Sequence, residues 1–218
     1  EHLIYAHPAI VFHMKLLFNL IYDHGFVPDN FGKGRTVPLV KDTTGDTSVC
    51  ENYRAITISP LISKLFEYCI LNKFDALLFS SELQFGFKRK SSCSHAIFLL
   101  REVTEYFLNH GSNIFMAALD ASKTFYRVNH VKLFNILLDR GLPGRLIKVI
   151  YDWYSKTFTS VKWNGALSNP ISIKSGIRQG GILSPFMFNI YFDVVFDVLR
   201  SSDLGCHLPG SIYVGYIA

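Results

Sequence analysis

The sequence lacks the clustered cysteines and histidines that would hold a structural metal ion. Its four cysteines (Cys50, Cys69, Cys93 and Cys206) lie far apart and form no C-x-x-C pair. This spacing indicates neither a zinc site nor a disulfide framework. We therefore expect free, mostly buried thiols in a reducing compartment.

Long apolar runs and targeting signals are also missing. No stretch reaches the roughly 18 apolar residues that a membrane span needs. The first five residues have neither the basic flank nor the small-residue cleavage site of a signal peptide. We expect an intracellular protein, nuclear or cytoplasmic, with no membrane partner. Because residue 1 is not Met and residues 213–218 look like an interrupted strand, we expect both ends to be cut from something longer.

What the sequence does contain is enough apolar material for a core and a small excess of positive charge. Hydrophobic residues make up 49% of the 218 positions, and 22 Lys and Arg residues face 17 Asp and Glu, for a net charge of +5. Such a balance slightly favours a polyanionic partner. No internal repeat or Gly/Ser linker separates domains, so any domains must be tightly packed or interleaved.

Periodicity and helix-capping residues predict a mixture of helices and a few strands. Helices are expected at residues 10–22 (ending at Gly25), 60–79, 94–108, 129–140, 143–156 and 184–200, the last with Ser184 as N-cap and Pro185 in its first turn. Strands are expected at 36–40, at a buried segment 114–119, at a hairpin 159–163/170–173 around Asn164-Gly165, and at 212–218. Residues 41–54 are polar and predict an exposed, mobile loop.

Two segments carry residues suited to chemistry. Asp120 directly follows the apolar run 114–119, and a carboxylate leaving a buried strand is suited to metal or phosphate chemistry, although a turn or cap residue is the plainer interpretation. The segment Ser175–Pro185 contains Arg178-Gln179-Gly180-Gly181, whose glycines permit a close backbone approach to a ligand. A glycine-rich hairpin end before a capped helix is the plainer interpretation there.

Together the two segments resemble the reverse transcriptases of non-LTR (LINE-like) retrotransposons. Five blocks match the family in order, and five ordered matches make coincidence very unlikely. The blocks are Val37-Pro-Leu-Val-Lys41; Asn52-Tyr-Arg-Ala-Ile56 with Ser63-Lys-Leu-Phe-Glu67; Gln84-Phe-Gly-Phe-Lys88; Asp120-Ala-Ser-Lys-Thr-Phe125; and Arg178-Gln-Gly-Gly-Ile-Leu-Ser-Pro185.

The resemblance implies an α+β fold of the right-hand polymerase type, helix-rich with a small antiparallel sheet. Residues 1–112 would form a fingers-like region. Residues 113–218 would form a partial palm with an interleaved fingers segment, incomplete at its C-terminus and without a thumb. The function implied is RNA-directed DNA polymerisation in the intact parent, using an RNA template, a DNA primer and dNTPs, within a longer retrotransposon polyprotein.

The resemblance also implies two Mg²⁺ ions in the intact parent enzyme, which activate the primer 3′-hydroxyl and stabilise the departing pyrophosphate. Asp120 matches a carboxylate ligand of these ions, and the backbone carbonyl of Ala121 matches a further ligand. Phe125 matches an aromatic that crowds the sugar 2′-position and excludes ribonucleotides, although an ordinary core phenylalanine would occupy the same place.

The remaining matches concern nucleotide and nucleic-acid binding. Gln179 and Gly180 match residues that line the incoming nucleotide, and Arg54, helped by Lys41, matches basic residues that neutralise its triphosphate. Arg178 either contacts nucleic acid or pairs with a neighbouring carboxylate. The run Lys88-Arg89-Lys90 could follow template phosphates, or it could simply be a solvated face.

Several departures from the family pattern matter. Tyr126 stands where a second Asp is usual, Ala55 replaces a Pro, and Lys90 replaces a Gly. The Tyr-x-Asp-Asp block is absent, and no Asp or Glu follows Asp203. With one carboxylate instead of three, the chain as it stands is expected to bind Mg²⁺ weakly and to be inactive. An apolar strand at 212–217 left at an open edge would make it poorly soluble.

Two alternatives share these features. One is a catalytically dead RNA-binding remnant that kept the fingers and palm scaffold. The other is a protein similar to a group II intron maturase, which shares the palm chemistry but fits the Asp120 and Arg54 blocks less well.

Overall fold

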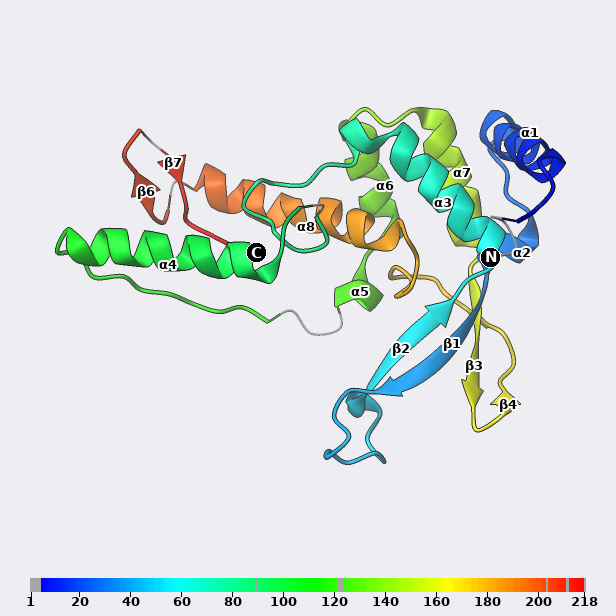
Figure 1. The fold of residues 1–218 in the computed structure, drawn as a ribbon, viewed down its shortest axis with the longest axis horizontal. Helices are drawn as coiled ribbons and strands as arrows, with labels where there is room; N and C mark the ends of the chain where they lie inside the picture. The colour runs from blue at the N-terminus through cyan, green and yellow to red at the C-terminus, as the bar shows by residue number, and fades with distance from the viewer. Residues whose placement is uncertain (1–4, 89, 121–123, 203, 211, 218) are drawn as a thin grey trace.

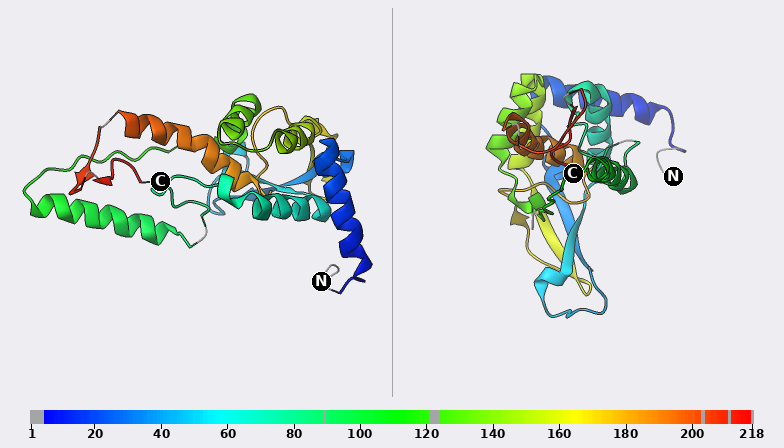
Figure 2. Two further views of the ribbon diagram at one scale, coloured as in Figure 1. Left: turned by 90° about the horizontal axis from the view of Figure 1, so that it is seen from above. Right: turned by 90° about the vertical axis from the view of Figure 1, so that its left-hand side faces the viewer.

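The computed structural model describes residues 5–88, 90–120, 124–202, 204–210 and 212–217. The chain forms a helical body from which a small twisted sheet projects, as Figures 1 and 2 show from three directions. In chain order the elements are α1 (Ala9–His24), α2 (Asp29–Gly32), β1 (Lys33–Val40), a 3₁₀ turn (Cys50–Asn52), β2 (Tyr53–Ile58), α3 (Leu61–Lys73), a second 3₁₀ turn (Asp75–Leu77), α4 (Cys93–Asn109), α5 (Thr124–Arg127), α6 (His130–Asp139), α7 (Gly144–Ser155), β3 (Phe158–Trp163), β4 (Ala166–Leu167), β5 (Ile171–Ser172), α8 (Ser184–Ser201), β6 (His207–Leu208) and β7 (Ile212–Tyr213).

The main sheet is mixed, where an antiparallel sheet was predicted. β1 pairs antiparallel with β2 but parallel with β3, and β3 pairs antiparallel with both β4 and β5. A parallel pair requires a long crossover between its strands, and here the crossover contains several helices. The prediction was wrong because only the local hairpin leaves a signal in the sequence. At that hairpin, Asn164 and Gly165 both have positive φ angles (44° and 84°), as predicted.

The capping residues place most helix ends as predicted. Gly25 adopts a left-handed conformation (φ 67°) after α1, and its N–H donates to the carbonyl of Ile21. The side chain of Asn129 accepts from the N–H of Lys132 at the start of α6. Pro143 directly precedes α7.

Two helix boundaries differ from the prediction. α8 has Leu183 as its N-cap, so Ser184 lies inside the helix and not at the cap. α3 ends at Lys73 and not near residue 79, because the backbone leaves the helical region at Phe74 (φ −118°, ψ 21°). The chain then makes a 3₁₀ turn that buries Leu78. The strand predicted at 212–218 is short as well, since β7 contains Ile212–Tyr213 alone.

The core lies among α1, α3, α6, α7 and α8, where amphipathic helices face one another. Its fully buried side chains include Leu133, Leu137, Leu146, Ile150, Met187 and Ile190. An aromatic group joins this core to the base of the sheet: Phe31 meets Trp153 edge-on at 5.7 Å, and the Trp153 indole N–H donates to the carbonyl of Phe31 (3.0 Å). This base fixes the sheet against the helical body.

A column of aromatic rings runs along α8. Phe125 stacks on Phe188 at 4.3 Å; Phe188, Phe192 and Phe196 then follow at four-residue spacing. At the far end Phe196 stacks on Tyr216 at 4.3 Å. Side chains four residues apart share one helix face, so one side of α8 connects residue 125 with the C-terminal residues.

The segment 113–120 is not the buried strand that was predicted. It is extended but pairs with no strand among the described residues, and Phe115 and Leu119 are 96% and 93% exposed. A strand requires hydrogen-bond partners for its backbone, and the described part of the chain places none beside this segment. In Figure 1 it runs back from the outer end of α4 toward the helical body.

The cysteines are free, as predicted, but they are not mostly buried. Cys50, Cys69 and Cys93 are exposed and Cys206 is half-buried. Within the described residues, no helix is long and apolar enough to cross a membrane.

A buried ion pair fixes α8 to its surroundings. Asp193, 3% exposed, accepts from Arg140 Nη2 at 2.8 Å and from the N–H of Ser81. Arg140 also donates to the carbonyl of Phe79. The pair therefore ties α8, the end of α6 and the connection after α3 to one another.

Replacing Asp193 by Asn is expected to lower the free energy of unfolding because it leaves Arg140 without its counter-charge. We expect a loss toward the lower end of about 3–5 kcal/mol, since Arg140 keeps some contact with water. Urea denaturation measures it. The control is Asp197→Asn on the exposed face of the same helix, expected to change stability by less than about 0.5 kcal/mol. Equal effects of the two substitutions would contradict the assignment.

Candidate functional site

The segment Arg178–Leu183 lies against strand β2. The N–H of Thr57 donates to the carbonyl of Gln179 at 2.7 Å. Gly180 has a φ of 112°, and a Cβ added to it would lie 2.4 Å from the carbonyl oxygen of Thr57. A glycine is therefore required here both for its backbone conformation and for the close approach.

The same segment is tied to helix α5 on its other side. The N–H of Ile177 donates to the carbonyl of Phe125 at 2.7 Å. A Cβ on Gly176 would lie 2.6 Å from the Cα of Tyr126, so these two backbones are also in close contact. The Tyr126 hydroxyl donates to Oε1 of Gln179 at 3.2 Å. Tyr126, which replaces the family's usual Asp, thus contacts a predicted nucleotide-binding residue.

These contacts form a hollow of about 230 Å³ between β2, α5 and the start of α8. Its lining consists of Arg54, Ile56, Phe87, Phe125, Arg178, Gln179, Gly180, Ser184 and Pro185. Five residues that the sequence singled out therefore meet at one place, although they come from three segments far apart in the chain.

Phe125 is half-buried at the edge of this hollow. Its ring stacks on Phe188 at 4.3 Å and meets the ring of Phe87 edge-on at 6.1 Å. The side chain therefore packs as a core phenylalanine on one side and faces the hollow on the other, so the two interpretations of Phe125 do not exclude each other.

The other predicted residues do not line the hollow. Asp120 is exposed and lies outside any helix or strand. Nζ of Lys41 donates to the carbonyl of Glu51 at 2.7 Å, within the loop at the tip of the sheet. Nζ of Lys88 donates to the carbonyl of Ser81 at 3.0 Å, and Lys90 is exposed. Ala121 and Arg89 lie outside the described residues.

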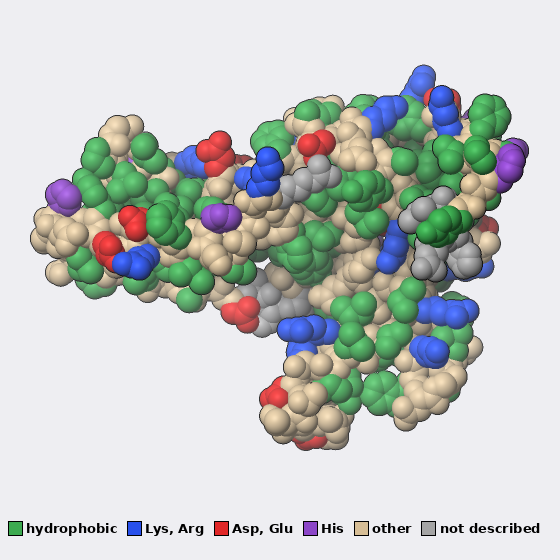
Figure 3. All heavy atoms as spheres, viewed as in Figure 1, with side chains coloured by type: hydrophobic (Ala, Val, Ile, Leu, Met, Phe, Trp, Pro, Cys, Tyr) green, Lys and Arg blue, Asp and Glu red, His purple; other side chains and the backbone are tan. Residues whose placement is uncertain are grey.

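Basic side chains are nonetheless close to the sheet. Figure 3 shows Lys and Arg side chains over the strands and acidic side chains at the tip. The tip loop is ordered by its own hydrogen bonds: Asp42 accepts from Thr44, and Asp46 accepts from Ser48. These bonds lower the pKa of both carboxyl groups. The loop is exposed, as predicted.

A buried carboxylate supports the Arg178–Leu183 segment from beneath. Glu67 of α3 is 5% exposed, and one of its oxygens accepts from the N–H groups of Ile182 and Leu183. Burial raises the pKa of Glu67, while these N–H groups and the charge of Arg178 oppose that rise. Sequence reasoning placed Glu67 in a family block but gave it no role.

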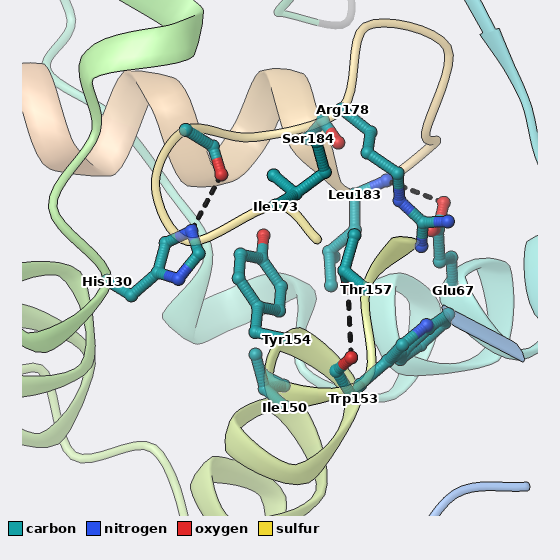
Figure 4. A pocket seen from close by; sticks show the side chains of 11 residues that line it. Glu67, His130, Ile150, Trp153, Tyr154, Thr157, Ile173, Arg178, Leu183 and Ser184 are labelled. Carbon is teal, nitrogen blue, oxygen red and sulfur yellow. Dashed lines mark hydrogen bonds between the residues drawn. The ribbon is translucent and has the colours of Figure 1, made fainter. Parts of the chain in front are cut away.

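Arg178 points toward this carboxylate and away from open solvent. Figure 4 shows its guanidinium beside Glu67 and Trp153, around a cavity of about 20 Å³. The guanidinium lies 6.0 Å from the Trp153 ring centroid, and Nη1 donates to the carbonyl of Gly32 at 3.4 Å. Burial lowers the pKa of Arg178 and raises that of Tyr154 in the same cavity.

The described residues do not form a metal site by themselves. They contain no group of three or more His, Cys, Asp or Glu side chains placed to hold an ion. Mg²⁺ prefers octahedral oxygen coordination, and Asp120 is the only described carboxylate that matches a metal ligand of the family pattern. A two-ion centre therefore does not fit the residues present.

A comparison with protein families identifies the family to which this chain belongs. The model of the family described as "Reverse transcriptase (RNA-dependent DNA polymerase)" matches residues 40–217. The chain belongs to the reverse transcriptase family. Its α+β fold, with a helical body and a small mixed sheet, is consistent with the fingers and palm of these enzymes.

Curated relatives come from non-LTR retrotransposons. The chain is 24% identical over 199 residues to the "Retrovirus-related Pol polyprotein from type-2 retrotransposable element R2DM" of Drosophila melanogaster, covering 91% of the chain and 18% of the relative. It is 26% identical over 179 residues to the R2 Pol polyprotein of Popillia japonica, covering 82% and 25%. It is 23% identical over 200 residues to the "RNA-directed DNA polymerase from mobile element jockey" of Drosophila melanogaster, covering 90% and 21%. The chain thus spans between about a sixth and a quarter of these relatives.

Replacing Glu67 by Gln keeps an oxygen for the two N–H groups and removes the charge. Because the pKa of Glu67 is raised in the folded state, its ionisation disfavours folding. The contribution of protonated Glu67 to folding stability is therefore complete below the pKa of the unfolded state, near 4.5. This contribution is lost as the pH rises through the pKa of the folded state. We expect the wild type to lose stability relative to Glu67→Gln over that range, measured by urea denaturation at a series of pH values. A difference between the two proteins that is constant with pH would refute the expected ionisation.

Proposed function

We propose that this chain forms the fingers and part of the palm of an RNA-directed DNA polymerase of a non-LTR retrotransposon. Residues 1–112 form the fingers-like region and residues 113–218 the partial palm. The pairing of β1 with β3 supports an interleaved arrangement, since it brings residues 158–161 into the sheet built by residues 33–58. RNA template, DNA primer and dNTPs are the proposed partners, within a longer polyprotein such as those of the relatives.

The observation that carries the proposal is the hollow between β2, α5 and α8. Its lining includes the cation Arg54 on a strand, the aromatic ring of Phe125 on a helix, and the side-chain amide of Gln179 next to Gly180 in a loop. We assign Arg54 to the triphosphate, because a guanidinium binds phosphate oxygens with charge-assisted hydrogen bonds. Gln179 and Gly180 line the sugar, where the missing side chain of Gly180 leaves room for it. We assign Phe125, which lines the same hollow, to crowding a 2′-hydroxyl of the sugar.

Reverse transcriptases generally use Mg²⁺, which in this chemistry polarises the attacking hydroxyl and stabilises the leaving group. Asp120 is the candidate carboxylate of this chain. Since the described residues do not fit a two-ion centre, the role we assign to the hollow is binding and orienting the nucleotide. Lys88 and Lys90 are assigned to nucleic-acid phosphates. Lys90 is exposed, and Lys88 keeps one donor on its ammonium group after it binds the carbonyls of Ser80 and Ser81.

Arg54→Ala is expected to weaken dNTP binding about tenfold or more, because a charge-assisted hydrogen bond contributes about 1.5–3 kcal/mol. Fluorescence anisotropy with a labelled deoxynucleoside triphosphate measures the Kd. Arg101→Ala is the matched control: it removes an exposed arginine of α4, paired with Glu105. Its Kd should equal that of the wild type. Equal weakening by both substitutions would indicate non-specific electrostatics and oppose the assignment.

Primer extension tests the catalytic part of the proposal. With dNTPs, Mg²⁺ and a primed RNA, the 218-residue chain and Asp120→Asn are both expected to stay at background, because one carboxylate cannot organise two ions. Extension by the wild type alone would overturn the expected inactivity and support Asp120 as a ligand. Equal extension above background by both would oppose a metal role for Asp120.

Asp120 is the one carboxylate that matches a metal ligand of the family, and this favours a second candidate function. That candidate is a non-catalytic RNA-binding protein built on the same scaffold. Salt-dependent RNA binding with no effect of Arg54→Ala on dNTP affinity would favour this candidate over the polymerase fragment.

A further inference from the structure

Phe87 adopts a backbone conformation that glycine or asparagine adopts far more readily. Its φ is 53°, in the left-handed region, where a bulky residue is a genuine outlier. Its side chain is 59% exposed, so core packing does not explain why an aromatic ring occupies this position. Strained backbone that the surrounding structure maintains is often found at ligand-binding sites.

Hydrogen bonds hold the residues on both sides of Phe87, through the carbonyl of Gly86 and the side chain of Lys88. Nδ2 of Asn189, on α8, donates to the carbonyl of Gly86 at 2.7 Å. Nζ of Lys88 donates to the carbonyl of Ser81 at 3.0 Å. The ring is therefore presented from a fixed loop, and its edge contact with Phe125 at 6.1 Å fixes the ring from one side.

Phe87 lies between two hollows and lines both of them. One is the candidate nucleotide site of about 230 Å³. The other encloses about 240 Å³ and is lined by Asp75, Leu78, Phe79, Ser80, Phe87, Lys88, Phe186 and Asn189. The wall continues from one hollow to the next along α8, since Pro185 lines the first and Phe186 the second.

We propose that Phe87 is a stacking platform for an unpaired nucleobase of a single-stranded nucleic acid in the second hollow, and that its ring separates this base from the nucleotide in the first hollow. The proposal rests on the function proposed above, and it adds a base-binding site and a path for the strand. Exposed aromatic rings bind successive bases of single strands in a sequence-tolerant way, while cations follow the backbone. Lys88 lines the second hollow together with Phe87 and is the cation for the phosphates of this strand.

The test separates base stacking from phosphate binding by comparing two ligands. One is a fluorescent oligoribonucleotide, and the other is an abasic oligomer of the same length, with the same charge but no bases. The wild-type chain should bind the abasic oligomer at least about fivefold more weakly, since stacking contributes about 1–3 kcal/mol per base. Phe87→Asn and Phe87→Leu should lose this difference and bind both oligomers with the affinity that the wild type has for the abasic one.

Two further measurements exclude a purely structural role. Asn tolerates a positive φ, so Phe87→Asn should melt at the wild-type temperature or above it. Phe12→Leu removes another exposed phenylalanine, on α1, and should retain the full preference for the oligomer with bases. A lowered melting temperature for Phe87→Asn together with an unchanged preference would overturn the proposal and make Phe87 a packing residue.

The outcomes also distinguish this proposal from the proposed function. If Arg54-dependent dNTP binding is present but the wild type binds the two oligomers equally, the stacking site is wrong and the nucleotide site stands. If base-dependent binding is lost in Phe87→Asn while dNTP binding does not depend on Arg54, the stacking site stands and the nucleotide assignment is wrong.

Discussion

The close approach of two backbones, at Thr57 and at Gln179–Gly180, is the contact on which the candidate site depends. It joins strand β2 to the loop before α8, and so it sets the distance between Arg54 and Gln179. No side chain could occupy position 180 without moving the strand. The Glu67 carboxylate supports the same loop from the opposite side, so the loop is fixed between α3 and the sheet. In the function proposed above, selectivity near Gln179 would depend on main-chain packing as much as on side chains.

Local signals predicted most of the helices and the position of the tight hairpin. Gly25, Asn129 and Pro143 determine helix ends through their own φ angles or side-chain acceptors, which do not depend on distant residues. The grouping of Arg54, Phe125 and Gln179 followed from the family resemblance, because periodicity alone contains no information on which loops meet. In the structure all three line one hollow, while the role of each stays a prediction.

What the sequence could not predict depends on contacts between distant segments. β1 and β3 pair in parallel although the helices α3 to α7 lie between them in the sequence. The apolar run 114–119 looks like a buried strand because its composition matches one, yet burial requires a neighbour, which the described residues do not provide. Glu67 and Phe87 both lay in recognised blocks. Their environments become visible only in three dimensions: Glu67 is a buried carboxylate that accepts from two N–H groups, and Phe87 is an exposed ring on strained backbone.

The aromatic column along α8 has a consequence for how such a protein can evolve. Phe125, at the edge of the hollow, is also the first ring of a stack that continues through Phe188 to Tyr216. If Phe125 excludes ribonucleotides as proposed, a smaller residue at 125 that admitted them would also leave a void at one end of this stack. Sugar discrimination and thermodynamic stability would then be coupled, so that a lineage could relax the discrimination only if its stability exceeded what folding requires.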